Sequence, residues 1–325
     1  MARQEDLCIA IDVGGTKTRV ALIDRTGTLL QRDSEATLAN QGREQTVERL
    51  TRMIARLISL SGGGNLIGIG ASLASPVDPD TATMYNPPNL PGWDGFSPKS
   101  LLEETFHIPV WAANDATLGA IGEHAYGIGQ GVTNLIYLTV STGIGGGIIV
   151  DGNPILGARG FAGELGHISI DRNGPSCSCG NVGCLETFAS GTAIAKFARE
   201  RLEKKQDSLI LEMVEGDITR VNAKVVMEAA GQGDSLAVEL VEQFARDLGL
   251  GLVNLMHIFD PQMIIIGGGV SQSSHVYSAA LDAAIRHNVM AHHLEHINVV
   301  TSVLGDDASL LGAANLTFQR GGREE

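Results

Sequence analysis

The sequence predicts an α/β protein with two domains. Short apolar runs typical of buried strands alternate with longer segments of helical periodicity, which is the pattern of an α/β fold. A strand, a glycine-rich turn and a return strand occur at the start and again near residue 140. We interpret this as a weak internal repeat, with one unit for each domain. The 325 residues provide enough chain for two domains and a large core.

Apolar runs in the first half predict a series of short strands. We expect them at residues 7–13, 18–24, 28–33, 66–71, 108–112, 135–140 and 148–150. Residues 43–60 predict a helix, because their apolar side chains recur at three- and four-residue steps. The Pro- and Gly-rich residues 86–98 predict a long loop.

The second half predicts a long amphipathic helix and two further strands. Leucines from Leu236 to Leu255 and Phe244 make the apolar face of the helix. Strands are expected at 263–266 and 297–300, and a closing helix at 308–318. No Pro- or Ser-rich linker separates the halves, so we expect domains that share a hinge.

Composition and charge narrow the class of protein. Hydrophobic residues make up 43% and charged residues 18%, as in soluble globular proteins, and 41 glycines indicate many tight turns. The formal net charge of −14 argues against a nucleic-acid partner. We expect no signal peptide and no membrane span, since no long apolar run occurs. One isolated and three clustered cysteines suit a reducing cytoplasm, and Cys8 is expected in the core.

The first glycine turn follows the first strand and has the sequence DVGGTK. Adjacent Gly14 and Gly15 let backbone N–H groups point at a phosphate, and Thr16 adds a hydroxyl donor beside Lys17. Asp12 is a candidate for holding Mg²⁺ or its water. The alternative is an ordinary hairpin turn, because paired glycines are a common turn signal.

Two more glycine turns follow buried strands. The first of these spans residues 141–147 and includes Thr142 and Gly143; the second consists of Gly267, Gly268 and Gly269. Each has the same alternative, a flexible turn. A nucleotide held by two domains needs one phosphate loop from each, and the third turn allows an adenine or ribose to lie against bare backbone. Neither a Walker A nor a GxGxxG pattern is present.

Three cysteines and a histidine form the most specific local signal. His167, Cys177, Cys179 and Cys184 provide four donors within 18 residues, the number that tetrahedral Zn²⁺ takes. With no position left for water, such a site is structural. The alternative is a set of buried or redox-active thiols beside an unrelated histidine.

Asn114 and Asp115 follow the strand at 108–112 and precede the helix-like residues 116–123. A carboxylate at a strand end can take the proton from an attacking hydroxyl during phosphoryl transfer. By itself the pair is more often a helix cap. The presence of the other motifs in the same chain favours the catalytic role for Asp115.

With these residues in place, the chain resembles the family of repressors, open reading frames and kinases (ROK), and within it the bacterial glucokinases. The likeness runs from about Ile9 to Ala314. It comprises the DxGGTK start, NPPNLPGW at residues 86–93, Asn114-Asp115, STGIGGG, and GELGH followed by CSCGNVGCLE. The resemblance implies an actin-like (ribonuclease H-like) ATPase fold with two α/β domains around a cleft, at 1–116 with about 305–325 and at 117–304. It also implies a cytoplasmic homodimer or tetramer.

The resemblance implies a role for each matching residue. Asp115 would be the general base for phosphorylation of a hexose by ATP and Mg²⁺, and the four Cys and His donors would bind structural Zn²⁺. The sugar would be held by residues on several loops: Ser75, Asn89, Asn114, Asp115, Glu164, His167 and Glu186. The nucleotide would be held by Asp12, Gly14, Gly15, Thr16, Lys17, Thr142, Gly143, Gly267, Gly268 and Gly269.

Two departures and several alternatives remain open. Ala74 and Ser75 stand where similar kinases carry Pro-Gly, which puts the sugar contact of that loop in doubt. Pro76 stands where the N-acetylmannosamine kinases of the family place an Arg, which disfavours that substrate. Glucose is the leading sugar substrate, ahead of fructose, mannose and N-acetylmannosamine. ATP is the expected phosphate donor, with polyphosphate as the alternative. The competing class of protein is a sugar sensor without catalysis. Only eight residues precede Ile9, which leaves no room for the helix-turn-helix of the repressor branch.

Overall fold

The computed structural model describes residues 5–204 and 207–322. Packing divides the chain into two compact units. The first comprises the residues up to Thr133, Gly147–Gly163 and the residues from Val303 onward; the second comprises Asn134–Gly146 and Glu164–Ser302. The domains expected from the sequence, 1–116 with about 305–325 and 117–304, stay a prediction. The two units are defined by packing alone, and domains defined by motion can have other boundaries.

The first unit contains a five-stranded mixed sheet in the order β3-β2-β1-β4-β5. The strands are β1 (Asp6–Val13), β2 (Lys17–Asp24), β3 (Leu29–Ala36), β4 (Asn65–Leu73) and β5 (Val110–Asn114). Strand β1 pairs antiparallel with β2 and parallel with β4. It is the centre of the sheet and is mostly apolar and buried between Leu7 and Val13, with Asp12 as the buried exception. Cys8, Ile9 and Ile11 are fully buried, which confirms Cys8 as a core residue.

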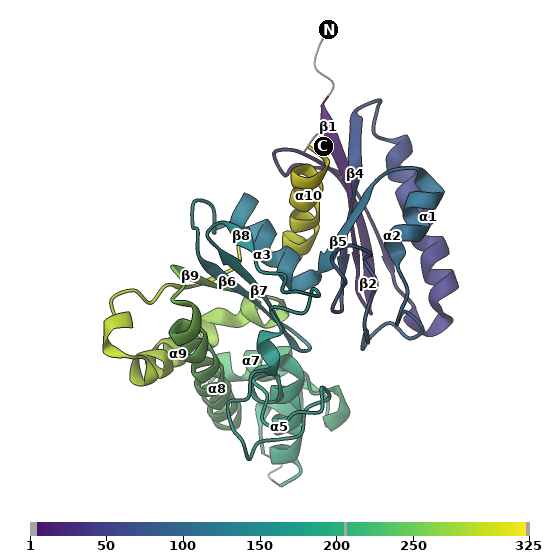
Figure 1. Ribbon diagram of the computed structural model, residues 1–325. Helices are drawn as coiled ribbons and strands as arrows, with labels where there is room; N and C mark the ends of the chain where they lie inside the picture. Colours follow the sequence, from purple (N-terminus) through teal and green to yellow (C-terminus); the bar gives the residue numbers. More distant parts are fainter. Residues whose placement is uncertain (1–4, 205–206, 323–325) are drawn as a thin grey trace. The chain divides into compact units, whose positions relative to one another are not determined.

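Helices cover both faces of this sheet. The helices are α1 (Arg43–Ser59), α2 (Pro98–Phe106), α3 (Asp115–Tyr126) and α10 (Ala308–Gly321). Figure 1 shows α1 and α2 on one face, with α10 and α3 packed together on the other. Because three strand ends and the start of α3 meet at one edge of the sheet, candidate site residues from separate motifs gather there.

The second sheet has the order β10-β9-β6-β7-β8. Its strands are β6 (Leu135–Val140), β7 (Ile144–Val150), β8 (Asn153–Pro154), β9 (Met263–Gly267) and β10 (Val299–Thr301). Strand β9 lies parallel to both β6 and β10. The carboxyl ends of β6 and β9 therefore lie at the same edge, and each leads into a glycine turn.

Helices of the second unit pack around the long α8, whose apolar face confirms the predicted amphipathic helix. The helices are α4 (Glu186–Ala189), α5 (Gly191–Leu202), α6 (Leu209–Met213), α7 (Ala223–Gly231), α8 (Ser235–Phe259) and α9 (Ser274–Asn288). Figure 1 shows α8 beside α9. Short 3-10 helices occur in both units: η1 (Ala39–Gln41), η2 (Leu165–His167), η3 (Ile218–Arg220), η4 (Gly269–Ser273), η5 (Ala291–His293) and η6 (Gly305–Asp307). No helix built from the described residues is both long and apolar enough to cross a lipid bilayer.

One expectation about an element was wrong, and one helix after the predicted loop at 86–98 was missed. The second glycine turn was expected over 141–147, but β7 already begins at Ile144. Consecutive glycines suggest a turn, although a strand accepts them where another backbone packs closely. The loop at 86–98 ends in an unpredicted helix, α2. Its start is marked by Ser97, whose hydroxyl accepts the N–H of Ser100, and by Pro98 in the first helical turn.

Candidate active site

The glycine turn of the first unit joins β1 to β2 and is held by neutral groups. The Gly14 N–H donates to the Lys17 carbonyl at 3.1 Å. Thr37 fixes the turn from outside: its hydroxyl donates to the Gly14 carbonyl at 2.6 Å, and its N–H donates to the Thr16 carbonyl at 2.9 Å. The turn predicted from the sequence is thus an ordered hairpin, which Thr37 stabilises with two further hydrogen bonds.

The 86–97 loop packs directly on this turn. A Cβ atom at Gly15 would lie 2.3 Å from the Cβ of Asn89, so no other residue fits there without moving the loop. The loop is anchored by Leu90 and Trp93, each 1% exposed. The structure therefore brings Asn89 and the first glycine turn together, two motifs that are more than 70 residues apart in the sequence.

Asp12 is buried and its charge is balanced by Arg19. One carboxylate oxygen accepts from Arg19 Nε at 3.0 Å and Nη2 at 2.5 Å, and the other accepts from the Ser72 hydroxyl at 2.8 Å. Arg19 also donates to the Asp306 carbonyl. Sequence reasoning missed Arg19. The signal was present, because a tight hairpin after Asp12 places Arg19 directly opposite it on β2.

Asn114, rather than Asp115, is the N-cap of α3. The Asn114 side-chain oxygen accepts the N–H groups of Ala116 at 2.9 Å and Thr117 at 3.4 Å, while its amide nitrogen donates to the Ser75 carbonyl at 3.1 Å. The first helical residue is Asp115. One residue thus caps the helix and ties down the loop after β4, and it leaves the neighbouring carboxylate at the strand–helix junction.

The glycine turn of the second unit spans Ser141–Gly143 and is held by a charged group. The Ile144 N–H, next to the turn, donates to Glu186 Oε2 at 2.8 Å. The Ser141 carbonyl accepts the Gly191 N–H at 2.7 Å, and the Thr142 carbonyl accepts the Thr192 N–H at 3.3 Å. Glu186, expected only as a sugar ligand, thus also contacts the predicted phosphate turn.

The third glycine turn follows β9 and packs against β6. Gly268 has a φ of +82°, a conformation that L side chains rarely adopt. The Ser271 hydroxyl donates to the Gly268 carbonyl at 2.7 Å. Gly269 has open space on the side where a Cβ would lie, because the nearest atom there is the Ser141 hydroxyl oxygen, 3.8 Å away. The turn offers bare backbone beside the Ser141–Gly143 turn.

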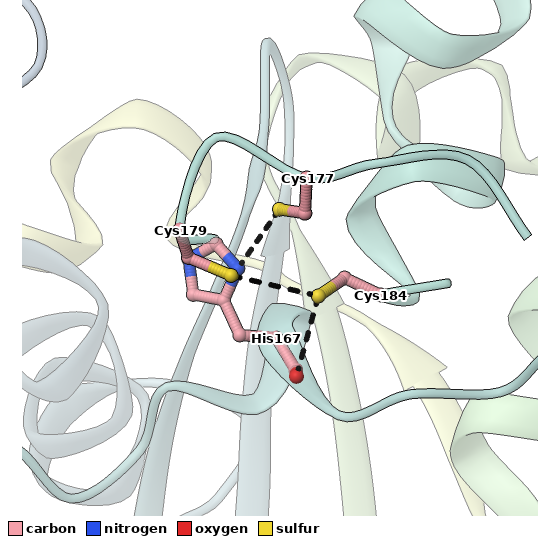
Figure 2. A group of neighbouring side chains, drawn as sticks. All are labelled: His167, Cys177, Cys179 and Cys184. Atoms are coloured by element: carbon pink, nitrogen blue, oxygen red, sulfur yellow. Dashed lines mark hydrogen bonds between the residues drawn. The ribbon is translucent and has the colours of Figure 1, made fainter. Parts of the chain in front are cut away.

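The four predicted metal donors come together in the second unit. Their ligand atoms all lie within 4.8 Å of one another, and among the residues that the structure describes they form the one such His, Cys and acidic group. Figure 2 shows the His167 ring turned toward the sulfurs, with Nδ1 3.5 Å from Cys177 Sγ and Cys179 Sγ 3.7 Å from Cys184 Sγ. All four cysteines of the chain are free of disulfides.

These distances fit tetrahedral zinc. Zn–S bonds of about 2.3 Å at a tetrahedral angle separate two sulfurs by about 3.8 Å, and a Zn–N bond of about 2.0 Å separates nitrogen from sulfur by about 3.5 Å. Backbone hydrogen bonding at Asn181 lowers the pKa of the Cys179 thiol, whereas burial raises that of Cys184 to about 12. The donor set and its spacing are compatible with a structural Zn²⁺.

His167 connects the metal donors to the acidic residues. Its second ring nitrogen, Nε2, lies 3.8 Å from Glu164 Oε2. Burial raises the pKa of the Glu164 carboxyl, His167 lowers it, and the nearby Glu186 raises it further. The result is a half-buried surface rich in hydrogen-bond acceptors, next to the metal donors.

Comparison with known proteins identifies the group to which this chain is similar. The model of the ROK family matches residues 8–320. A glucokinase of Thermotoga maritima is 33% identical over 312 residues, which cover 96% of this chain and 97% of that protein. A putative xylose repressor of a Caldicellulosiruptor species is 31% identical and is covered over 78% of its own length.

A solved structure agrees in fold. A ROK family glucokinase from Streptomyces griseus, in complex with glucose and AMPPNP, superimposes with a TM-score of 0.84 at 34% identity, covering 96% of this chain and 99% of that one. This confirms the prediction of an actin-like ATPase fold with α/β architecture.

Proposed function

The chain belongs to the ROK family, and we propose that it is an ATP-dependent hexose kinase whose preferred substrate is glucose. The observation that carries the proposal is Asp115 at the junction of β5 and α3, where Asn114 fixes both the helix start and the Ser75 loop. This is a carboxylate on a rigid support beside a loop that can contact a sugar.

In the proposed reaction the oxygen of the sugar 6-hydroxyl attacks the γ-phosphorus of ATP, and Asp115 accepts the proton of that hydroxyl. The products are hexose 6-phosphate and ADP. A general base must reach the hydroxyl directly, and fixing Asp115 in the first turn of α3 limits the positions it takes. Asn114, Ser75 and Asn89 are proposed to bind the sugar from the same unit.

The second unit is proposed to hold the remaining sugar hydroxyls. Glu164, His167 and Glu186 supply acceptors that lie in or next to the metal-donor segment. We propose that His167, Cys177, Cys179 and Cys184 bind structural Zn²⁺, which would fix the loop and the histidine tautomer. A site built to hydrogen-bond hydroxyls rejects analogues that lack them.

We propose that the nucleotide is bound by the glycine turns of both units: Asp12, Gly14, Gly15, Thr16, Lys17, Thr142, Gly143, Gly267, Gly268 and Gly269. Mg²⁺ would supply charge neutralisation on the transferred phosphoryl group. The carboxylate of Asp12 suits Mg²⁺ or its water, and Arg19 holds that carboxylate in place.

Similarity to a putative xylose repressor supports a second candidate, a sugar-binding regulator without catalysis. Asp115 favours catalysis, because sensing needs no base. Other hexoses and polyphosphate as donor are alternatives within the kinase class. We further propose a cytoplasmic homo-oligomer, which light scattering tests against the 34.2 kDa of one chain.

The decisive experiment is a panel of glucose, mannose, fructose and N-acetylmannosamine, each with ATP and with polyphosphate, assayed by coupled product formation. We expect the highest kcat/KM for glucose with ATP. A higher value for N-acetylmannosamine would overturn the glucose assignment and leave the kinase. No turnover of any pair, with sugar binding retained, would identify a regulator.

A further inference from the structure

Glu186 lies where the metal-donor segment meets a glycine turn. It is the first residue of α4 and follows the donor Cys184 by two positions. Its Oε2 accepts the Ile144 N–H at 2.8 Å. This is the first N–H after the Ser141–Gly143 turn, so a carboxylate attached to the metal-donor loop determines where the turn ends and β7 begins.

The contact is close enough to fix the shape of the turn. A Cβ at Gly143 would lie 2.2 Å from Glu186 Oε2. A side chain at 143 and the carboxylate at its present place therefore exclude each other. Hydrogen bonds to a charged acceptor are short and strong, so this one holds the turn more firmly than a neutral contact would.

Two further hydrogen bonds attach the turn to the residues after Glu186. The Ser141 and Thr142 carbonyls accept the N–H groups of Gly191 and Thr192. Both carbonyls are thereby directed at the start of α5. Besides the hydrogen bond within the turn from the Ser141 N–H to the Gly143 carbonyl, these contacts all come from the segment 186–192, which continues directly from the metal-donor loop.

We infer that Glu186 is a positioning residue for the nucleotide turn as well as a sugar ligand, so that one carboxylate links the sugar site to the phosphate site. The inference rests on the proposed function. One oxygen is engaged by the Ile144 N–H, which leaves the other for a sugar hydroxyl. Sugar binding that orders this carboxylate also orders the turn and so increases the affinity for the nucleotide. By linkage, the nucleotide increases the affinity for the sugar by the same factor.

The test measures MgADP binding by calorimetry in the absence of any sugar, so that a role confined to the sugar leaves the result unchanged. Glu186→Ala removes the acceptor and should raise the Kd for MgADP about tenfold, the range expected for loss of a charged hydrogen bond. Glu186→Gln keeps an acceptor oxygen and should stay within about threefold of wild type. The matched control is Glu164→Ala, which removes a proposed sugar ligand without a contact to the turn; it should weaken glucose binding and change the Kd for MgADP less than about twofold.

A second variant guards against misfolding of Glu186→Ala, which is checked by its metal content and melting temperature. Gly143→Ala displaces the carboxylate from the turn and should raise the Kd for MgADP as well. A wild-type value of that Kd in folded Glu186→Ala would overturn the inference while leaving the kinase intact, whatever Gly143→Ala shows, because Gly143 is itself a proposed nucleotide contact. If wild-type protein binds no MgADP, the proposed function and the inference fail together.

Discussion

The first unit places several of its candidate site residues at the ends of regular elements, whereas the second places most of its own in a segment with little regular structure. Asp12, Asn114 and Asp115 lie in or next to β1, β5 and α3. In the second unit, residues 168–185 contain no named helix or strand and are held by isolated bridges and by backbone hydrogen bonds of turns. The metal donors and the sugar acceptors lie in or beside this segment.

The difference shows two ways to hold a polar side chain in position. In the first unit, backbone hydrogen bonds of strands and a capped helix fix the geometry, and no metal is needed. In the second unit, the loop has no continuous strand ladder, and the proposed metal at its four clustered donors would offset the conformational entropy lost when the loop is ordered. The first unit should therefore tolerate loss of a site side chain, and the second should lose structure when a donor is removed.

Replacement of Asp115 gives the largest expected effect and tests the first half of this comparison. Asp115→Asn should lower kcat by about 10²–10⁴-fold, because the amide cannot accept a proton. The Kd for glucose and the melting temperature should stay near wild type, since Asn114 still caps α3. The matched control is Asp80→Asn, an exposed carboxylate of the same unit. A kcat above half of the wild-type value, or a fall in melting temperature as large as that from loss of a metal donor, would contradict this picture.

Removal of one metal donor tests the second half. Cys179→Ser should abolish the expected one zinc per chain, lower the melting temperature by about 10 °C and weaken glucose binding, because metal binding and folding are linked. The matched control, Cys8→Ala, removes a thiol buried in the core of the first unit and should keep the full metal content. Elemental analysis that finds no zinc in wild-type protein, with freely reactive thiols, would remove the basis of the comparison.

Two carboxylates that accept local hydrogen bonds give the smallest expected effect: Asp24, at the turn after β2, and Asp234, the N-cap of α8. They should behave alike in both units. Burial tends to raise the pKa of Asp24 and of Asp234, but hydrogen bonds from Thr26 and Thr28 to the first, and from Ala237 and Leu209 to the second, outweigh it and leave both pKa values lowered.

A lowered pKa in the folded state means that each carboxylate stabilises the fold fully above its unfolded pKa of about 3.9, and that this contribution is lost as pH falls through the folded pKa. Asp24→Ala and Asp234→Ala should each lower the melting temperature by about 2–4 °C at pH 7, and less at pH 3. Unequal losses at pH 7 would show that the two units differ in more than the metal-donor segment.

The α/β class was predictable from the sequence because several elements are locally encoded, whereas the actin-like fold was implied by the family resemblance. The apolar run of β1 and the periodic leucines of α8 each identify one element without reference to the rest of the chain. The metal donors were predictable for the same reason, since all four lie within one short segment.

Contacts between distant segments were not predictable. The hydrogen bond from Ile144 to Glu186 joins residues 42 positions apart, and neither residue type indicates the other. The packing of Asn89 on Gly15 likewise depends on where a long irregular loop returns. The cross-strand pair of Asp12 and Arg19 is an intermediate case, because a hairpin register would have found it.

The packing of Asn89 on Gly15 sets a rule for laboratory evolution of substrate preference. The 86–97 loop is an obvious segment to randomise, yet its position depends on the absence of a side chain at Gly15, on which Asn89 packs. Libraries that vary Gly15 together with the loop will mostly sample displaced backbones. Libraries that hold Gly15, Leu90 and Trp93 constant keep the residues that anchor the loop, so the loop is expected to stay in place.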